Sequence, residues 1–514
     1  MKVLLTTLNS KYTHKNIALY YLQNKIKHLC EVSFLNLNIN DLINNNLNKI
    51  LASKPEVVCF GVYIWNLEIT LKLAADIKAI NPSVIIGFGG PEVSYNPDEI
   101  LSKYPFVDSV LCGESENNIV AFIQDIQLNN WQKKYNLPVE AVDIPRITPN
   151  IINDYDGRIV YFETSRGCAF NCSYCLSCLD LRVRYFDLEL VKEDLKKLLA
   201  LNVKQIRFID RTFNVNKERA LAIWQFLLQN RYDTTFHFEI CAALIDEEVL
   251  TFLKDVPKDI FRFEIGLQST NKKTLSAINR RYDFIYEKKV IKKLVKMDNI
   301  HLHVDLIIGL PYETLDIFKK SFNDVYGLHA NELQLGFLKF LKGTDIYLQK
   351  EEYGYEYSNY PPYEVLQNKF LAYEEIAYLK KFETVFEYLY NSKKFLNSML
   401  YLETKFTDYY TMYEYITGYF IKHNLLDTKV AYDNIYEHLI NLFNHDEILI
   451  QTLTYDFMSN FKGTRTWFYH KYDVKHEIKE REKEFKYLIL DYDIKRHQVV
   501  KTIYKIKKEK GNNE

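Results

Sequence analysis

The chain carries no excess of charge of either sign. Its 514 residues include 66 Lys and Arg against 67 Asp and Glu, a formal net charge of −1 with His neutral. This balance argues against a protein that coats nucleic acid or an anionic membrane by bulk charge. The chain also lacks the roughly 18 consecutive apolar residues of a membrane span and the pattern of a secretory leader, so we expect a cytoplasmic protein.

Structural disulfides are not expected in that compartment, and this changes the meaning of the cysteines. The chain has eight cysteines, and four of them fall between residues 168 and 178. In a reducing compartment such a cluster indicates metal or redox chemistry. The other four stand in apolar, strand-like contexts, where we expect them in the core: Cys30, Cys59, Cys112 and Cys241.

A length of 514 residues suggests about three domains. Residues 1–135 alternate short apolar runs with amphipathic helical patterns such as 69–80. This alternation predicts a Rossmann-like, doubly wound parallel sheet whose strand-end loops line a ligand crevice. Its strands are expected at 3–8, 31–37, 55–66, 83–93 and 106–114.

Residues 136–158 contain three prolines and little periodicity, which indicates a linker. A second series of six strand-like runs, each followed by a helical pattern, occupies 159–350. These runs predict a partial (β/α)6 TIM-like barrel with its chemistry at the C-terminal ends of the strands. The six runs are 158–165, 203–210, 234–242, 260–269, 300–311 and 332–341.

Residues 351–514 have a different pattern. Segment 364–460 reads as several helices rich in Tyr, Phe and Leu, and the lysine-rich end holds strand-like runs at 484–495 and 499–506. We therefore expect a mostly α-helical C-terminal domain of unknown role.

The most informative segment is ETSRGCAFNCSYCLSC, directly after the first barrel strand. Cys168, Cys172 and Cys175 have the spacing C-x3-C-x2-C. Three thiolates can hold three irons of a 4Fe–4S cluster and leave the fourth iron open for chemistry. Cys178 follows after two more residues and could be a core residue, a reactive thiol or a fourth ligand. A fully ligated iron–sulfur or zinc site that organises a non-catalytic scaffold is therefore the alternative.

This pattern resembles the radical S-adenosylmethionine (SAM) superfamily. The resemblance implies that Cys168, Cys172 and Cys175 hold a 4Fe–4S cluster whose fourth iron binds SAM. Reductive cleavage of SAM would then give a 5′-deoxyadenosyl radical that abstracts hydrogen. The resemblance also implies an electron donor such as flavodoxin or ferredoxin, and a small-molecule or peptide substrate that the sequence does not identify.

Further segments extend the resemblance to the SAM site. Tyr174 stands at the family's aromatic position near the adenine, and Arg280 in AINRRYD resembles an arginine that pairs with the SAM carboxylate. Asp210 in FIDRTFN stands where relatives bind the SAM amine, although the usual pair of glycines is absent. Segments FEIGLQS and DLIIGLPYET resemble two more SAM-binding strands, with candidates Glu264, Gln268, Ser269, Ile308, Gly309 and Leu310.

A Rossmann-like domain ahead of such a barrel resembles the cobalamin-binding members of the superfamily. The resemblance lies in the start of the chain, FGVYIWN, GFGGPEVS and VLCGESE. It implies that strand-end loops face cobalamin. The candidate residues are Thr7, Asn9, Tyr63, Trp65, Gly89, Gly90, Pro91, Glu92 and Gly113.

The Asp-x-His-x-x-Gly motif that ligates cobalt in many cobalamin proteins is absent from residues 1–130. The histidines there are His14, in the first loop, and His28, late in a helix. The absence weakens cobalt–His ligation more than cobalamin binding. The sequence thus predicts a radical SAM enzyme with cobalamin for methyl transfer or another radical modification. Radical chemistry without cobalamin is a third interpretation.

Overall fold

The computed structural model describes residues 1–138, 159–280, 283–444, 446–460, 487–493 and 498–504, without the side chains of 178, 458, 487–493 and 498–504. The chain divides into two compact units, Met1–Thr314 with Gly336–Ala372 and Leu315–Leu335 with Tyr373–Glu514. The predicted four-part division is finer and stays a prediction. The predicted linker falls almost wholly outside the described residues.

The N-terminal sheet has six parallel strands in the order β2-β1-β3-β4-β5-β6. The chain builds the sheet in opposite directions from β1 and β3, so the topological switch point lies between these two strands. The loops that follow them open a crevice at the carboxyl edge of the sheet. The predicted doubly wound sheet is therefore confirmed, with a sixth, short strand that the sequence pattern did not indicate. The strands are β1 (Lys2–Asn9), β2 (Glu31–Asn38), β3 (Val57–Gly61), β4 (Ile85–Gly89), β5 (Ser109–Leu111) and β6 (Lys134–Tyr135).

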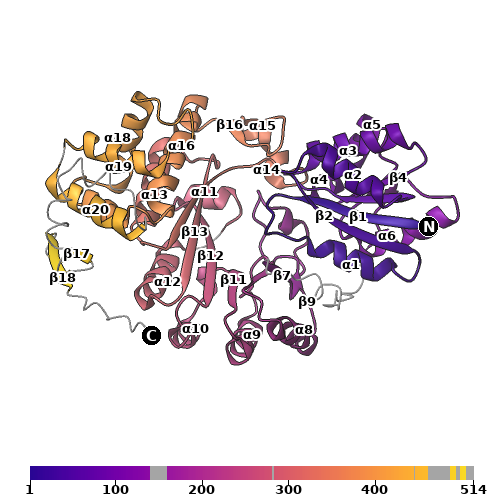
Figure 1. The fold of residues 1–514 in the computed structure, drawn as a ribbon, viewed down its shortest axis with the longest axis horizontal. Coiled ribbons are helices and arrows are strands. Elements are labelled where there is room, and N and C mark those ends of the chain that lie inside the picture. The colour runs from indigo at the N-terminus through magenta and orange to yellow at the C-terminus, as the bar shows by residue number, and fades with distance from the viewer. Residues whose placement is uncertain (139–158, 281–282, 445, 461–486, 494–497, 505–514) are drawn as a thin grey trace, which may run out of the picture. The chain divides into compact units, whose positions relative to one another are not determined.

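Alternating side chains of this sheet supply two separate apolar cores. On β1, Leu4 and Leu8 join one core, while Val3 and Leu5 join the other. Helices α2 and α3 cover the first core and α1 and α6 the second, as Figure 1 shows. The helices are α1 (Ile17–Ile26), α2 (Ile43–Ala52), α3 (Leu67–Ile80), α4 (Pro91–Ser94), α5 (Pro97–Lys103) and α6 (Ser115–Gln127).

The second sheet follows the chain order, β7-β10-β11-β12-β13-β14, and its first five strands pair in parallel. This is the predicted (β/α)6 arrangement of an open barrel. The strands are β7 (Val160–Phe162), β10 (Gln205–Phe208), β11 (Thr235–Glu239), β12 (Phe261–Gln268), β13 (His301–Ile308) and β14 (Glu332–Phe337). A short antiparallel pair, β8 (Ser165–Arg166) and β9 (Arg184–Tyr185), was not predicted.

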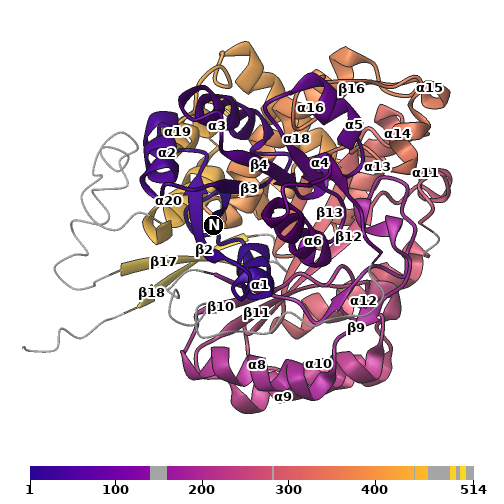
Figure 2. The same ribbon diagram turned by 90° about the vertical axis from the view of Figure 1, so that its right-hand side faces the viewer.

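One face of this sheet is aromatic. Phe238, Phe261 and Phe263 pack around Trp224 of α9, because every second residue of a strand points to the same face. Figure 2 shows α8, α9 and α10 together on one side of β10 and β11. The helices of this part are α8 (Leu188–Ala200), α9 (Lys217–Asn230), α10 (Glu247–Lys254), α11 (Lys272–Ala277) and α12 (Phe284–Met297). The shorter elements are η1 (Leu176–Leu179), η2 (Ala242–Leu244), α14 (Asp345–Leu348), α15 (Lys350–Tyr353), β15 (Glu356–Tyr357) and β16 (Val365–Gln367).

The second unit is helical around an aromatic core, which confirms the predicted helices between 364 and 460. Tyr326, Phe386 and Tyr413 lie within ring contact of one another. The elements are α13 (Leu315–Tyr326), α16 (Tyr373–Phe386), η3 (Glu387–Asn391), α17 (Leu396–Glu403), α18 (Tyr409–Lys422), α19 (Tyr432–Leu442) and α20 (Glu447–Asn460). The hairpin β17 (Tyr487–Asp493) and β18 (Gln498–Tyr504) matches the two predicted strand-like runs.

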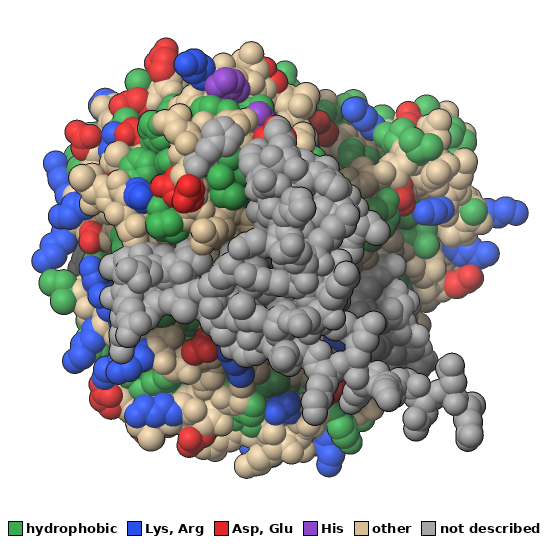
Figure 3. Space-filling view, turned by 60° about the vertical axis from the view of Figure 1, so that its left-hand side comes forward, with side chains coloured by type: hydrophobic (Ala, Val, Ile, Leu, Met, Phe, Trp, Pro, Cys, Tyr) green, Lys and Arg blue, Asp and Glu red, His purple; other side chains and the backbone are tan. Residues whose placement is uncertain are grey.

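Acidic and basic side chains are interspersed on the face drawn in Figure 3, in keeping with the balanced composition. No helix of the described part of the chain is both long and apolar enough to cross a membrane.

Candidate functional site

The three predicted cluster cysteines lie on one loop between β8 and η1. The Cys168 amide donates to the Asp180 carbonyl, and the Cys175 amide donates to the Cys172 carbonyl. Gly167 starts the loop at φ +87°, where an added Cβ would lie 2.2 Å from the Arg182 carbonyl oxygen. Backbone contacts that only glycine permits therefore shape this loop.

None of these three cysteines forms a disulfide, so their sulfurs can serve as cluster ligands. Burial raises the pKa of the Cys172 thiol, nearby Arg280 opposes the shift, and Cys175 and Cys168 are close enough to add to it. Among the described side chains, no three of the His, Cys, Asp or Glu type converge on one metal ion. A four-iron cluster needs no such convergence, because each cysteine binds a different iron. The donor set thus fits the predicted cluster.

Arg280 and Tyr174 lie beside the cysteine loop. Nη1 of Arg280 is 3.9 Å from the Cys172 sulfur, and Nη2 donates to the Gly266 carbonyl. Burial raises the pKa of the Tyr174 hydroxyl, which Arg280 opposes. The structure therefore brings the predicted adenine and carboxylate contacts of SAM together with the cysteines.

Asp210 lies beneath this loop, and its carboxylate is held by the chain itself. It accepts hydrogen bonds from the Thr164 amide at 2.9 Å, the Thr164 hydroxyl at 2.7 Å and the Ser165 hydroxyl at 2.6 Å. Burial raises the pKa of Asp210, although these bonds oppose the shift. Its geometry is that of a buried anchor for the start of the loop, and its predicted contact with the SAM amine stays a prediction.

The three candidates near the end of β12 have different surroundings. Glu264 lies 3.1 Å from Nε2 of His237, and this contact holds the pKa of Glu264 below its usual range. The Ser269 hydroxyl donates to Glu313 at 2.5 Å. The Gln268 side chain is buried, and no donor among the described residues reaches its Oε1. This buried acceptor fits a ligand that donates hydrogen bonds, such as the SAM amine or ribose.

Ile308 ends β13, and Gly309 and Leu310 follow it directly. Gly309 has φ +93°, and its carbonyl accepts from the Tyr355 hydroxyl at 2.8 Å and from Nδ2 of Asn368 at 3.0 Å. These bonds occupy the Gly309 carbonyl. Its predicted backbone contact with adenine stays a prediction.

A cavity of about 740 Å³ opens where the strand ends of the N-terminal sheet face the cysteine-loop region. Its volume lies in the range of small-molecule and cofactor sites. Five of the nine cobalamin candidates line it: Tyr63, Gly89, Gly90, Pro91 and Gly113. Thr7, Asn9, Trp65 and Glu92 are not among its lining residues.

Of the other four candidates, Trp65 and Thr7 contact residues that line the cavity, whereas Asn9 and Glu92 contact residues that do not. Trp65 stacks on Tyr63 with ring centroids 4.6 Å apart, and its Nε1 donates to the Leu8 carbonyl. The Thr7 hydroxyl donates to the Gly61 carbonyl, and Asn9 donates to Asn36. The carboxylate of Glu92 accepts from the Tyr363 hydroxyl at 2.6 Å.

Two glycines give the cavity a backbone wall. Gly90 has φ +108°, and an added Cβ would lie 2.5 Å from the Val62 carbonyl oxygen. Gly113 has φ +63°, and an added Cβ would meet no atom within 4 Å. A flat, glycine-lined wall beside Tyr63 fits a planar macrocycle such as corrin.

The described residues that line the cavity include no histidine. His14 instead lies against the barrel, where its Nδ1 is 2.9 Å from the Tyr161 hydroxyl. Burial lowers the pKa of His14, and Arg207 and Lys11 add to the shift.

A group of charged residues at the cavity was missed from the sequence. Arg166 contacts Glu163 at 2.6 Å, Glu116 at 2.6 Å and Glu114 at 3.0 Å, and Arg184 pairs with the same Glu114. We call these five residues the clasp, since they join the N-terminal domain to the cysteine loop. Their signal was the charge pattern of GESE and ETSRG, but spacing alone cannot pair segments about 50 residues apart.

Three family models match the chain. The B12 binding domain matches residues 3–123, the Radical SAM superfamily matches 162–325, and Protein of unknown function (DUF4080) matches 351–513. The matched segments follow the order predicted from the sequence.

Proteins of similar sequence or fold agree with these matches. Cobalamin-dependent radical SAM methyltransferase TokK of Streptomyces tokunonensis is 25% identical over 311 residues, which cover 53% of this chain and 44% of that protein. The solved structure of apo OxsB, a cobalamin-dependent S-adenosylmethionine radical enzyme, has a TM-score of 0.62 at 15% identity, over 96% of this chain and 83% of that chain. TsrM from Kitasatospora setae, a radical S-adenosylmethionine methyltransferase, has a TM-score of 0.57 at 17% identity, over 68% and 76%. The chain thus spans less than half the length of TokK.

Two parallel α/β sheets, one carrying a three-thiol loop at its strand ends and the other a glycine-lined crevice, define a two-cofactor α/β protein. The chain carries a radical SAM domain, with a B12-binding domain before it and a DUF4080 domain after it. The predicted family, fold class and cofactor set of 4Fe–4S cluster, SAM and cobalamin are confirmed.

Proposed function

We propose that this protein is a radical SAM enzyme that cleaves SAM reductively and, with cobalamin on its N-terminal domain, methylates or otherwise modifies a substrate by radical chemistry. When bound, the cluster with SAM would supply the hydrogen-abstracting centre and cobalamin the methyl group. We further propose that an electron donor such as flavodoxin or ferredoxin serves as its reductant.

The observation that carries the proposal is the position of the cysteine loop. Cys168, Cys172 and Cys175 follow β7 at the carboxyl edge of one parallel sheet, and the clasp holds their loop against the carboxyl edge of the other. Ligand sites of both kinds of sheet lie at these edges. This arrangement supports two cofactor sites at the edges that the clasp joins.

The chain's own residues would hold and orient the bound groups. The three cysteines bind iron as thiolates, and the nearby guanidinium of Arg280 offsets their negative charge. The buried Oε1 of Gln268 accepts a hydrogen bond from SAM. Tyr63 and the backbone at Gly90 and Gly113 give the corrin a flat surface, while the clasp closes the edge of the cavity.

Anaerobic reconstitution tests the proposal. The reconstituted protein is given SAM and dithionite, and products are separated by liquid chromatography. 5′-Deoxyadenosine supports radical initiation, and S-adenosylhomocysteine formed only with added hydroxocobalamin and substrate extract supports methyl transfer. A reduced-cluster electron paramagnetic resonance spectrum that SAM leaves unchanged would contradict the open-iron model.

Cys178 provides the comparison with a saturated, non-catalytic cluster. Its side chain lies outside the described residues. The proposal predicts that Cys178→Ala keeps iron and sulfide content, whereas Cys172→Ala loses most of both. If Cys178→Ala loses the cluster as Cys172→Ala does, the scaffold interpretation is favoured.

A further inference from the structure

The face of the barrel sheet opposite the aromatic core is polar. On β12 the odd-numbered residues 261–267 are buried, while Arg262, Glu264 and Gly266 are partly accessible. Burial alternates in the same way on β13, and on β11 the buried His237 stands between Phe236 and Phe238, so the polar side chains of these strands share one face.

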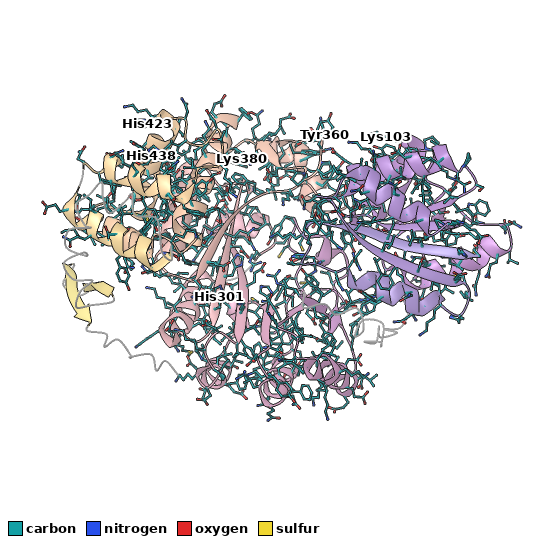
Figure 4. All side chains as sticks on the ribbon, in the orientation of Figure 1. Lys103, His301, Tyr360, Lys380, His423 and His438 are labelled. Atoms are coloured by element: carbon teal, nitrogen blue, oxygen red, sulfur yellow. The ribbon has the colours of Figure 1, made fainter. Side chains whose placement is uncertain are left out.

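Strand register arranges these side chains in rows. Tyr161 pairs with Arg207, Arg207 with His237, His237 with Arg262, and Arg262 with His301. We call these five residues the basic row. Figure 4 shows His301 on β13, toward its amino end. The row therefore lies deeper in the barrel than the strand ends.

Two arginines of the basic row have no carboxylate partner among the described residues, although Arg207 contacts the Tyr161 hydroxyl. The Nε atoms of Arg184, Arg207, Arg219, Arg231 and Arg262 are buried without an acceptor among the described residues. Arg184, Arg219 and Arg231 place terminal nitrogens on Glu114, on the Thr164 carbonyl and on the Tyr232 carbonyl. Within the described part of the chain, no carboxylate lies within ion-pair distance of Arg207 or Arg262.

The neighbouring carboxylates contact histidines and form no ion pair with these arginines, although Arg207 is close enough to Glu264 to help lower its pKa. Glu264 is engaged by Nε2 of His237 at 3.1 Å, and Asp305 lies 3.0 Å from Nε2 of His303. The Tyr161 hydroxyl contacts His14, and Arg207 opposes the effect of burial on the pKa of that hydroxyl through its charge and a side-chain hydrogen bond. A half-buried pair of guanidinium groups with no carboxylate within ion-pair distance among the described residues is unfavourable, and a bound anion would relieve it.

We propose that Arg207 and Arg262 bind an anionic group of the substrate, a phosphate or a carboxylate, inside the barrel. The two residues lie two strands apart, about 10 Å between Cα atoms, which long guanidinium side chains can span onto one anion. Neither lines the 740 Å³ cavity, so this site differs from the cobalamin candidate.

The register also sets the shape of the substrate. Arg262 precedes Gly266, next to Arg280, by four residues, about 13 Å along a strand. This inference rests on the proposed function, in which SAM binds at the strand ends. The substrate is then an elongated molecule that reaches from the basic row toward the strand ends.

Phosphate binding to the reconstituted full-length protein tests the site. Isothermal titration with inorganic phosphate, and separately with acetate, is run at constant ionic strength on the wild type, Arg207→Gln, Arg262→Gln and Arg231→Gln. Arg231 is the matched control, since its Nε is also buried without an acceptor but its Nη1 has a carbonyl partner. The wild type and Arg231→Gln should bind phosphate with equal affinity. Arg207→Gln and Arg262→Gln should bind it at least about tenfold more weakly.

Thermal unfolding separates a lost site from a damaged fold. Without anion, Arg262→Gln should melt no lower than the wild type, because it removes a half-buried charge that has no ion-pair partner. Phosphate should raise the melting temperatures of the wild type and Arg231→Gln, but not that of Arg262→Gln. The stronger of the phosphate and acetate responses identifies the anionic group.

Two results overturn the site: phosphate and acetate both bind no better than chloride, or both arginine variants bind as Arg231→Gln does. If either result is obtained with protein that still cleaves SAM, the anion site is ruled out and the proposed function is unaffected. If the anion binds as predicted but SAM is never cleaved, the proposed function fails and the site stands.

Discussion

Asp210 shows how one buried carboxylate can set the start of a cofactor loop. Because three donors from Thr164 and Ser165 converge on it, Asp210→Ala should lower the free energy of unfolding by about 2–4 kcal/mol and reduce iron retention. Asp210→Asn should have a smaller effect. Chemical denaturation and iron analysis measure both. A variant of unchanged stability with weaker SAM binding would instead favour the role predicted from the sequence.

Glu239 makes the folding stability of the first unit depend on pH. Burial raises its pKa to about 7, with Arg211 opposing and Glu264 adding to the shift. A raised carboxyl pKa favours the protonated folded state, so this stability is present below about pH 4.5 and is lost as pH rises through about 7. Glu239→Gln stays neutral and should melt about 2–4 °C above the wild type at pH 8, but equally at pH 4.5. Equal melting temperatures at both pH values would contradict the assignment.

At the scale of elements, the turn from β4 to α4 requires glycine at position 90. Gly90→Ala should cost about 2–3 kcal/mol, because its Cβ would meet the Val62 carbonyl and φ is +108°. Gly113→Ala is the matched variant: its Cβ enters open space, so it should cost only about 1 kcal/mol. Absorbance of retained hydroxocobalamin after gel filtration should fall in both. Full retention in Gly113→Ala would argue against corrin at this wall.

The clasp joins elements that are distant in sequence. Burial raises the pKa of Glu114, but Arg184 and Arg166 outweigh it and hold the pKa below its usual range. Glu114→Gln removes the charge shared by both arginines and should cost about 1–3 kcal/mol. Asp98→Asn, in an exposed pair with Lys134, is the control and should cost less than about 0.5 kcal/mol. Similar denaturation midpoints for the two variants would show that the clasp contributes little.

At the scale of the whole molecule, the two units should unfold separately. Calorimetry should resolve two transitions, and hydroxocobalamin should raise only the one that belongs to Met1–Thr314 with Gly336–Ala372. Asp456→Ala should lower only the transition of the other unit, Leu315–Leu335 with Tyr373–Glu514. The Asp456 carboxylate accepts four hydrogen bonds from Asn397 and Ser398, which the substitution removes. A single transition that moves with both changes would show that the units unfold together.

The sequence by itself determined the local features of this protein. The period-2 and helical patterns predicted both parallel sheets and the helical region, because side-chain alternation repeats within a few residues. The spacing of Cys168, Cys172 and Cys175 likewise lies within one loop. The two-residue strand β6 gave no such signal, since it exists through pairing with β5.

Tertiary structure alone decided which distant residues meet. Arg207, His237 and Arg262 form one row only through strand register, and His14 reaches Tyr161 across 147 residues. The clasp and the five cobalamin candidates that share the cavity depend in the same way on how the two sheets pack. The physical reason is that register and packing follow from the burial of whole sheet faces, which no short segment of the chain encodes.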